Sequence, residues 1–566
     1  MAAHAKKSVR MRDFLAWARP ILWPDKQFFY LAIVYGIAIS LLSLATPISV
    51  QLLINSIAYT AMPVPLFTLA LLLFGLLMAT NVLSAFRTHI MEIFRRKFFA
   101  RLVAEITMRA VHARDPFFSD ARRADLFNRY FDVMNVQKSI PSLLVGLFTI
   151  VLQSAVGFVV TSIYHPFFLV FNLVFIALVW IIWRVWSRPA MTEIVALSHA
   201  KYDTAHWLES VGASNGFYKS GRHIDYAIHK SDELTATYIA ADRRYFGNHF
   251  TQHIFYLTLY AAASAGLLAL GGWLVIQGQL SIGQLVAAEL ILSSIFYGAS
   301  QLGPYLESFY ELVAACEELH LFMEVPQESR TGKTAPHSDG AELCLADVKA
   351  GDIAFDFTIP QGKRLVAAAE PDVQRTFALL LKRHRRADAG FVTLGGADIS
   401  ALDIYQLRSD VIVLDKPTTV ESSIFDYLDL ATGDATPAEM MEAIKLVGLD
   451  RQIGRLPDGI QTVLSTTGWP LALPDVMRLK FAAATLARPR ILVLSPLFDM
   501  IARPDLERML AAFNSRDTTM IYFTNRATPP VMDGYFWLGR DRQALVASQT
   551  EFDALRYASE APNGDR

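Results

Sequence analysis

Glu289 is an ionisable residue inside an apolar segment, and it is the strongest candidate for a functional side chain there. It lies within an apolar run, about Ile282–Tyr305, where an ionisable group is costly and therefore a candidate for function. It can line a path for a translocated molecule, contact a partner helix, or lie close enough to water to be solvated, and the residues leave these three open. The two cysteines, Cys316 and Cys344, fit no metal-binding spacing and no disulfide framework, which suits a reducing cytoplasm. We therefore expect no metal site.

The composition indicates what kinds of domain the chain contains. The chain has 566 residues, 53% of them hydrophobic, a mean hydropathy of +0.31, and still 19% charged residues. This mixture predicts a membrane part joined to a water-soluble part. The net charge of −1 gives no indication of a nucleic-acid partner.

Apolar runs that can cross a bilayer need about 20 residues. Six such runs occur in the first part of the chain, which predicts six transmembrane helices and contact with membrane lipid. They are about Phe28–Ala58, Pro63–Phe86, Pro141–Tyr164, Pro166–Trp186, Ile254–Gln277 and Ile282–Tyr305.

The basic residues orient these spans. Lys and Arg are frequent before the first span, between the second and third, and between the fourth and fifth, whereas the three opposite connections contain none. Because excess Lys and Arg marks the cytoplasmic side, we expect both termini and both long loops in the cytoplasm. The sequence also predicts helix over most of these loops, as in Arg96–Ala113 and Met191–Glu209. The expected location is a bacterial inner membrane.

The segment Met11–Trp23 alternates basic and apolar residues and ends at Pro24. Its apolar residues can share one helix face, which favours an interfacial helix on the inner leaflet over a plain linker. The N-terminus carries no apolar core with a cleavage site, so no signal peptide is expected. The predicted organisation is residues 1–27 as a cytoplasmic N-terminus with this helix, 28–324 as a transmembrane domain, 325–340 as a polar linker, and 341–566 as a soluble domain.

The soluble domain alternates short β-like runs with helical segments, which is typical of an α/β fold with a parallel sheet. The runs are Leu365–Ala369, Val411–Leu414, Ile491–Leu494 and Met520–Phe523. The fold class predicted for the whole chain is therefore an α-helical membrane domain plus a cytoplasmic α/β domain.

Three stretches carry a specific resemblance. Leu456–Gly468 is similar to the residues before the signature sequence of ATP-binding-cassette (ABC) exporters, and Ile491–Leu494 keeps that family's spacing to the Walker B strand. Gly278–Leu285 resembles the connection between the fifth and sixth spans of the same exporters. The resemblance covers nearly the whole chain and implies a half-transporter, with six spans and a nucleotide-binding domain, that works as a dimer.

The resemblance also shows which chemistry is missing. A phosphate loop uses two glycines, a lysine and a hydroxyl to bind phosphates and Mg²⁺. The aligned residues here run from Ala369 to Thr376, without either glycine, with Gln374 in place of the second, and with Glu370 and Asp372 adding negative charge. Arg375 and Thr376 keep a positive charge and a hydroxyl, so they are the only vestigial cofactor-binding residues. We expect no ATP–Mg binding in the usual way.

Other ATPase motifs are degenerate as well. Ser495-Pro496 stands where the Walker B carboxylate and the general base belong, and Asn525 aligns with the switch histidine. The signature position reads Leu471-Ala472-Leu473-Pro474-Asp475, with Ala472 in place of the serine, and the family's glutamine falls near Lys416. No catalytic residue is therefore expected.

Family exporters also press two cytoplasmic loops onto their nucleotide-binding domains. By position, Asp125–Asn135 and Ser210–Tyr218 resemble these coupling loops. Their aromatic residues suit a packed contact with another domain, or they pack inside their own loops, and both alternatives stay open. These residues are Phe127, Tyr130, Phe217 and Tyr218.

Three functions fit these observations. The chain is the catalytically inactive half of a dimeric exporter, paired with an intact half; or it is an ATP-independent homodimer with a structural or regulatory role; or it is a passive or ion-driven carrier, for which Glu289 is the one indication. The lost signature weakens the first hypothesis, because a partner's ATP site would use it. The sequence does not identify a substrate.

Overall fold

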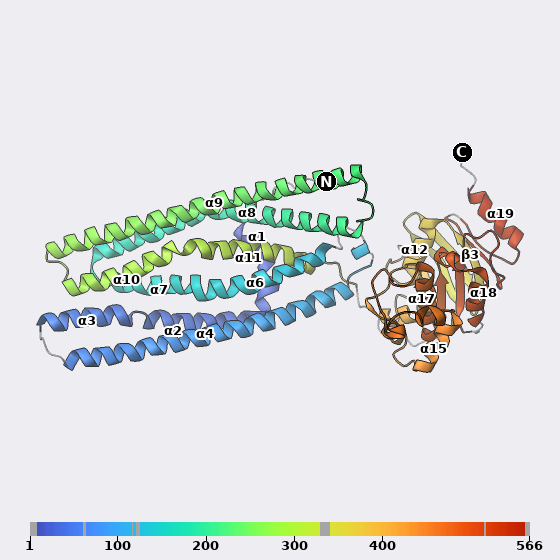
Figure 1. Cartoon of the computed structure of the whole chain (residues 1–566), viewed down its shortest axis with the longest axis horizontal. Helices are drawn as coiled ribbons and strands as arrows, with labels where there is room; N and C mark the ends of the chain where they lie inside the picture. Colours follow the sequence, from blue (N-terminus) through green and yellow to red (C-terminus); the bar gives the residue numbers. More distant parts are fainter. Residues whose placement is uncertain are drawn as a thin grey trace. The chain divides into compact units, whose positions relative to one another are not determined.

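The computed structural model describes residues 8–59, 64–115, 117–119, 125–328, 340–513, 517–540 and 542–560. It divides into two compact units, Met1–Gln327 and Glu328–Arg566, which are treated separately below (Figure 1). Most of the predicted linker, 325–340, lies outside the described residues.

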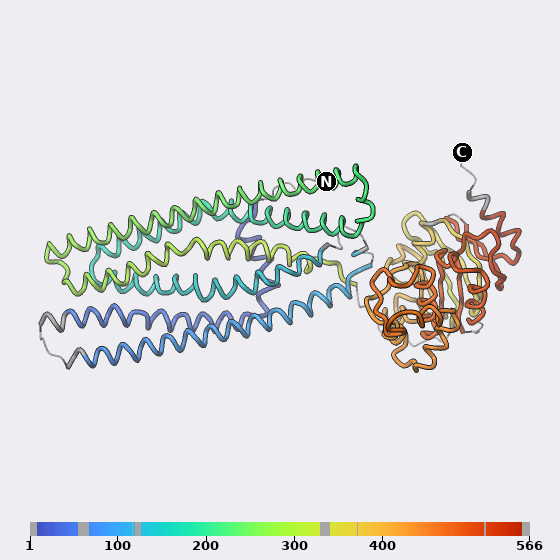
Figure 2. Tube along the Cα trace, viewed as in Figure 1, coloured from blue at the N-terminus to red at the C-terminus, as the bar shows by residue number. Residues whose placement is uncertain are grey.

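The first unit is helical, and its long helices run along one common direction, whereas α1 (Met11–Leu22) crosses them (Figure 2). The helices of this unit are α1, η1 (Trp23–Asp25), α2 (Lys26–Leu42), α3 (Ala45–Tyr59), α4 (Val64–Val111), η2 (Phe117–Ser119), η3 (Asp125–Phe131), α6 (Asp132–Pro141), η4 (Ser142–Leu147), α7 (Phe148–Tyr164), α8 (Pro166–Ala213), α9 (Gly221–Ile276), α10 (Ile282–Ser300) and α11 (Leu302–Met323).

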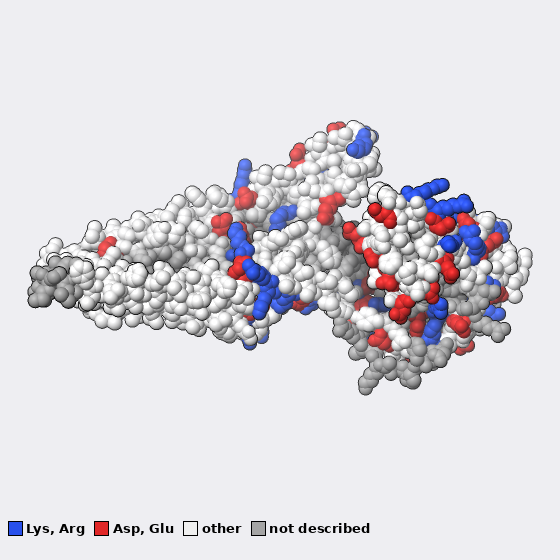
Figure 3. Space-filling model, turned by 60° about the horizontal axis from the view of Figure 1, so that its bottom comes forward, with Lys and Arg blue, Asp and Glu red and all other residues white. Residues whose placement is uncertain are grey.

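Six segments among the described residues are long and apolar enough to cross a membrane, which confirms the predicted number. The helices α4, α8 and α9 contain 48, 48 and 56 residues. At about 1.5 Å per residue they are more than twice as long as the ~30 Å hydrocarbon core, so each extends well beyond it. On the visible face of this unit, most charged side chains gather in a band and leave a long stretch that is almost free of charge (Figure 3).

The helix α1 matches the predicted N-terminal helix, but its apolar face contacts protein. Phe14, Ala18 and Ile21 are buried, and the Phe14 ring meets the Phe309 ring of α11 edge-on at 5.4 Å. Leu15, predicted on the same face, is exposed. The side chains of α11 thus cover much of the surface that was expected to face lipid.

The second unit contains a six-stranded sheet in the order β12-β11-β3-β10-β9-β6 and a four-stranded antiparallel sheet in the order β2-β1-β4-β5. In the larger sheet, only the edge strand β12 is antiparallel to its neighbour. Its strands are β3 (Arg364–Ala369), β6 (Val411–Leu414), β9 (Ile491–Leu494), β10 (Thr519–Phe523), β11 (Gly534–Leu538) and β12 (Gln543–Val546). The smaller sheet has β1 (Leu343–Ala350), β2 (Ile353–Ile359), β4 (Ala389–Leu394) and β5 (Ala397–Asp398).

Two apolar cores lie on the two faces of the larger sheet. One contains α12 (Pro371–Leu381), α13 (Ile404–Asp410) and the smaller sheet, and the other contains α14 (Ile424–Asp429), α15 (Pro437–Leu446), α17 (Leu473–Ala487) and α18 (Arg503–Ala512). The remaining elements are β7 (Ser422–Ser423), β8 (Val463–Leu464), α16 (Asp450–Ile453), η5 (Gly459–Gln461), η6 (Pro496–Met500) and α19 (Gln549–Glu560). The predicted α/β fold is confirmed.

Candidate functional site

The parallel strands bring three predicted motif positions to one edge of the sheet. The strands β3, β10 and β9 are direct neighbours, and their carboxyl ends lead into Ala369, the segment after Phe523, and Ser495. Thr524 N–H, after β10, donates to Ala367 O of β3 at 3.0 Å, and Ser495 N–H, after β9, donates to Leu414 O at the end of β6 at 3.3 Å. In open α/β sheets this edge is where ligands bind.

The first turn of α12 presents acidic groups at this edge. Glu370 is the N-cap residue of α12, Pro371 is its first residue, and Asp372 lies in its first turn. A helix N-terminus carries a partial positive charge that suits phosphate, and here carboxylates of the chain itself occupy that region. Of the two vestigial residues, Arg375 is exposed on α12, whereas Thr376 is only 7% exposed.

An arginine that follows the neighbouring parallel strand β11 joins this acidic cluster. Arg540, which follows β11, forms ion pairs through its guanidinium with Asp352 and Asp372, and its Nε lies 3.9 Å from Glu370 Oε2. Its backbone N–H also lies 3.5 Å from Glu370 Oε1. These groups are partly exposed, so each pair is weak alone. Together they place one internal cation among three carboxylates.

The position after β9 carries no charged group, but a carboxylate missed by the sequence analysis lies four residues further on. Ser495 is buried and its Oγ has no hydrogen-bond partner among the described residues, and Pro496 begins η6. Asp499, in η6, accepts hydrogen bonds from the Tyr522 hydroxyl, from Thr524 Oγ1 at 2.8 Å and from Asn525 N–H at 2.9 Å.

This arrangement fixes the segment that carries the predicted switch position. Arg526 donates to the backbone carbonyls of Asp499 and Ile501, while burial raises the pKa of the Tyr522 hydroxyl and keeps it a donor. Asn525 itself is held through its backbone, and its side chain is exposed. The only sequence signal for Asp499 is an acidic residue soon after a fully apolar strand.

We expect the substitution Asp499→Asn to lower the local stability of this segment by about 1–2 kcal/mol, since an amide oxygen replaces a charged acceptor. Hydrogen–deuterium exchange of the amides from Tyr522 to Arg526 measures the change. Asp517→Asn, at an exposed carboxylate just before β10, is the matched control and should leave the exchange unaltered. Equal exchange in both variants would contradict the role given to Asp499.

The signature position lies at the start of α17, which packs on β6 and η6 in the second core. Ala472 is the N-cap residue and makes no side-chain capping bond. Asp475 lies in the first turn, 3.5 Å from Arg478, and burial raises the pKa of its carboxyl although Arg478 opposes this. Further along α17, Lys480 Nζ donates to Lys416 O at 2.8 Å.

The aromatic residues of the first predicted coupling loop pack within the helical unit. The Phe127 ring lies 5.2 Å from Phe118 and 5.9 Å from Phe322 of α11, and the Tyr130 ring lies 6.1 Å from Phe99 of α4. Phe127 is still 43% exposed. For Tyr130, these contacts favour packing inside its own unit. Part of the Phe127 side chain stays exposed and available for another contact.

The second predicted coupling loop is the turn between α8 and α9. Phe217 stacks on His223 with a centroid distance of 4.2 Å and is 62% exposed, while Tyr218 lies 6.1 Å from Trp207. The turn is therefore held by its own residues and still presents the Phe217 ring to its surroundings.

Glu289 lies on α10, and its side chain is half-buried. Ser293 Oγ donates to Glu289 Oε1 at 2.8 Å, while Oε2 is buried without a hydrogen-bond partner among the described residues. The residue thus keeps an unused acceptor in an apolar helix.

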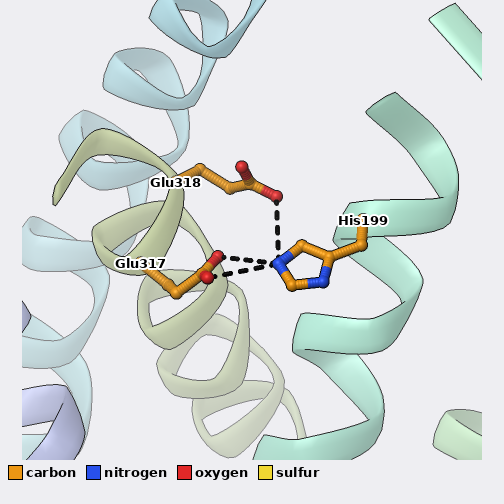
Figure 4. A group of neighbouring side chains, drawn as sticks. All are labelled: His199, Glu317 and Glu318. Carbon is orange, nitrogen blue, oxygen red and sulfur yellow. Dashed lines mark hydrogen bonds and ion pairs between the residues drawn. The ribbon is translucent and has the colours of Figure 1, made fainter. Parts of the chain in front are cut away.

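A second group of ionisable side chains, which sequence reasoning did not identify, joins α8 to α11 (Figure 4). His199 Nε2 lies 3.2 Å from both carboxylate oxygens of Glu317 and 3.9 Å from Glu318 Oε1. These atoms lie close enough together to hold a metal ion. However, Glu318 already pairs with Arg129 Nε at 2.5 Å and accepts from Ser198 Oγ at 2.9 Å.

The pKa directions in this group follow from its contacts and its burial. His199 lies well beyond the predicted end of its span, and the hydrogen bond to Glu317 raises its pKa. Burial raises the pKa of Glu318, against the opposing effect of Arg129. The arrangement is a largely buried network of ionisable side chains between α8, α11 and η3.

Comparisons with known proteins find similarity over nearly the whole chain. No protein-family model matches it. In sequence it is similar to the lactococcin-A transport/processing ATP-binding protein LcnC of Lactococcus lactis subsp. lactis, with 21% identity over 95% of this chain and 76% of that protein. It is also similar to the exotoxin translocation ATP-binding protein PaxB of Pasteurella aerogenes, with 22% identity over 85% of this chain and 69% of that protein.

In structure the chain is similar to a bacterial Atm1-family ABC exporter solved with ATP bound. The TM-score is 0.78 with 16% sequence identity, over 96% of this chain and 99% of that chain. The six apolar helices and the α/β domain that follows them therefore have the fold of an ABC exporter.

Proposed function

Because the chain is a multi-pass membrane protein with the half-transporter fold of ABC exporters, we propose that it is the non-catalytic half of a dimeric exporter-like transporter. It performs little or no ATP hydrolysis of its own. Both termini and the long helical loops lie in the cytoplasm, as the distribution of Lys and Arg supports.

One observation carries the proposal of inactivity. At the edge of the sheet where a nucleotide phosphate would need cations and backbone N–H groups, Glu370 and Asp372 stand at the N-terminus of α12 and pair with Arg540. Phosphate would meet two carboxylates there, and Arg540 would have to leave Asp352 and Asp372 to bind it. The absence of a carboxylate at Ser495-Pro496 supports the same conclusion for the hydrolysis step.

The start of α17 favours a second candidate, an ATP-independent homodimer with a structural or regulatory role. In ABC dimers the signature of one chain completes the ATP site of the other, and Asp475 at this position would repel phosphate. The ATP site formed by a partner's intact phosphate loop and this signature position would thus be impaired. A passive or ion-driven carrier is the third possibility, supported by the unused acceptor of Glu289.

The test is purification of the full chain from its native membrane, identification of co-purifying chains, and measurement of nucleotide binding and ATPase activity. The proposal expects an intact cassette partner, and no vanadate-sensitive turnover from this chain alone. A stable lone homodimer without nucleotide binding would support the second candidate. Robust ATPase activity from the chain alone would overturn the proposed inactivity.

A further inference from the structure

The first predicted span is not one continuous helix. The helix α2 ends at Leu42 and α3 begins at Ala45, so Ser43 and Leu44 form a turn inside the apolar run. Pro47 has no N–H with which to bond the carbonyl of Ser43, four residues earlier, and this explains why the helix is interrupted here. Irregular backbone at membrane depth is tolerated where it is buried in protein or lines a polar cavity.

A cavity of ≈ 210 Å³ lies at this break. The four polar side chains that line it are those of Ser43, Thr46, Gln153 and Ser294, and Gln153 Nε2 donates to Ser294 Oγ at 3.2 Å. The remaining lining residues are apolar: Leu44, Pro47, Leu290, Ile291 and Ile295. The lining therefore contains hydroxyl and amide groups from three spans and no charged side chain.

The depth of this cavity follows from the positions of its residues in their spans. Ser43 lies near the middle of the run Phe28–Ala58, Gln153 near the middle of Pro141–Tyr164, and Ser294 near the middle of Ile282–Tyr305. Three spans thus place polar side chains at the same level, close to the centre of the bilayer.

Polar groups at this depth are expensive unless something satisfies them. Ser294 is exposed at the surface of the single chain, and a hydroxyl facing lipid tails would lose its hydrogen bonds to water. In transport proteins, binding sites formed at interrupted helices near the bilayer centre resolve this cost by contact with the transported molecule. Here, too, an interrupted helix and polar side chains meet near the bilayer centre.

We propose that this cavity, the Ser43–Gln153–Ser294 site, binds the uncharged, hydrogen-bonding head group of an amphipathic molecule. The proposal rests on the proposed transport function and names the class of its cargo. Hydroxyl and amide groups of the lining match alcohols and amides, and no lining cation is present to bind an anion. The volume equals that of about seven water molecules, which admits a head group but not a whole drug-sized molecule.

Photolabelling of the full chain in nanodiscs tests the proposal without ATP or a partner. The probes are a monoacylglycerol with a diazirine next to its glycerol head group, and a fatty acid with the same chain and diazirine position. Mass spectrometry locates the label. The expected result is labelling of Ser43–Pro47 and Leu290–Ile295 by the monoacylglycerol, at least about fivefold above the fatty acid, the factor expected for one lost hydrogen bond.

Variants make the result specific. Ser294→Ala and Gln153→Leu should each lower this labelling about fivefold. Thr258→Val, which removes an exposed hydroxyl from α9, should leave it unchanged. Should Gln153→Leu fail to fold, Ser294→Ala still decides. Equal labelling by both probes, unchanged labelling in the variants, or label confined to other helices would overturn the proposal. Since no step requires nucleotide, ATPase activity would refute the proposed inactivity and leave this result standing.

Discussion

Replacing Arg129 with Met should destabilise the contact between α8, α11 and η3 by about 3–5 kcal/mol, the cost of leaving a buried charge unpaired. The Glu318 side chain is 0% exposed and that of Arg129 is 15% exposed, with Arg129 Nε 2.5 Å from Glu318 Oε2. After the substitution, only Ser198 and the more distant His199 would remain to stabilise the Glu318 carboxylate. Hydrogen–deuterium exchange of the α11 amides around Glu318 should accelerate about a hundredfold or more.

Two further variants separate charge burial from loss of packing. The double substitution Arg129→Met, Glu318→Met removes both charges and should recover most of the lost protection, because apolar side chains of similar size can replace a buried pair. Arg95→Met breaks an exposed pair with Glu92, whose side chains are 49% and 41% exposed, and should cost less than about 1 kcal/mol. If the double variant were as unstable as Arg129→Met, the buried charge would not be the cause.

This network illustrates what the sequence could not predict. The length, apolarity and flanking charges of the spans are local properties, so the six spans and the long helical loops could be derived from the sequence. The partners Arg129, Ser198, His199 and Glu318 come from two loops and the last helix of the unit, and nothing in their separate neighbourhoods indicates contact. Such contacts depend on how the helices pack.

The same distinction between local sequence properties and contacts that depend on packing applies to the second unit. Once the motif spacing is known, Ala369, Ser495 and Ala472 can be compared with the family's motifs, whereas the contacts near these positions cannot be predicted in this way. Arg540 lies more than 150 residues after Asp372, and Asp499 reaches Asn525 from a neighbouring strand exit. The structure adds the ion pairs that internal carboxylates form there with an arginine.

The interruption of the first span was also not predicted, because Ser43 and Pro47 lie in a run whose hydropathy is continuous. Apolar composition decides that a segment enters the membrane, and single polar or proline residues barely alter it. The position of the Ser43–Gln153–Ser294 site depends on how tightly α7 and α10 approach each other, and a glycine on each helix allows this approach.

One of these glycines is Gly157 of α7, and we expect Gly157→Leu to destabilise the α7–α10 contact by about 3 kcal/mol. A Cβ atom at Gly157 would lie 2.7 Å from Ile295 Cδ1 and 2.8 Å from Ile291 Cγ2, closer than such atoms can approach. In a bilayer, close packing at small residues is a main source of helix association, so a larger side chain must separate the helices. Exchange of the α7 and α10 amides measures the loss.

The same substitution links packing to the Ser43–Gln153–Ser294 site, since Ile291 and Ile295 also line it. Separation of α7 from α10 moves Gln153 away from Ser294, and labelling by the monoacylglycerol probe should fall with the protection of the helices. Gly75→Leu is the matched control, because a Cβ at Gly75 of α4 meets no atom within 4 Å. It introduces the same side chain in another span and should change neither measurement. Loss of labelling in Gly75→Leu, or full protection in Gly157→Leu, would show that the site does not depend on this contact.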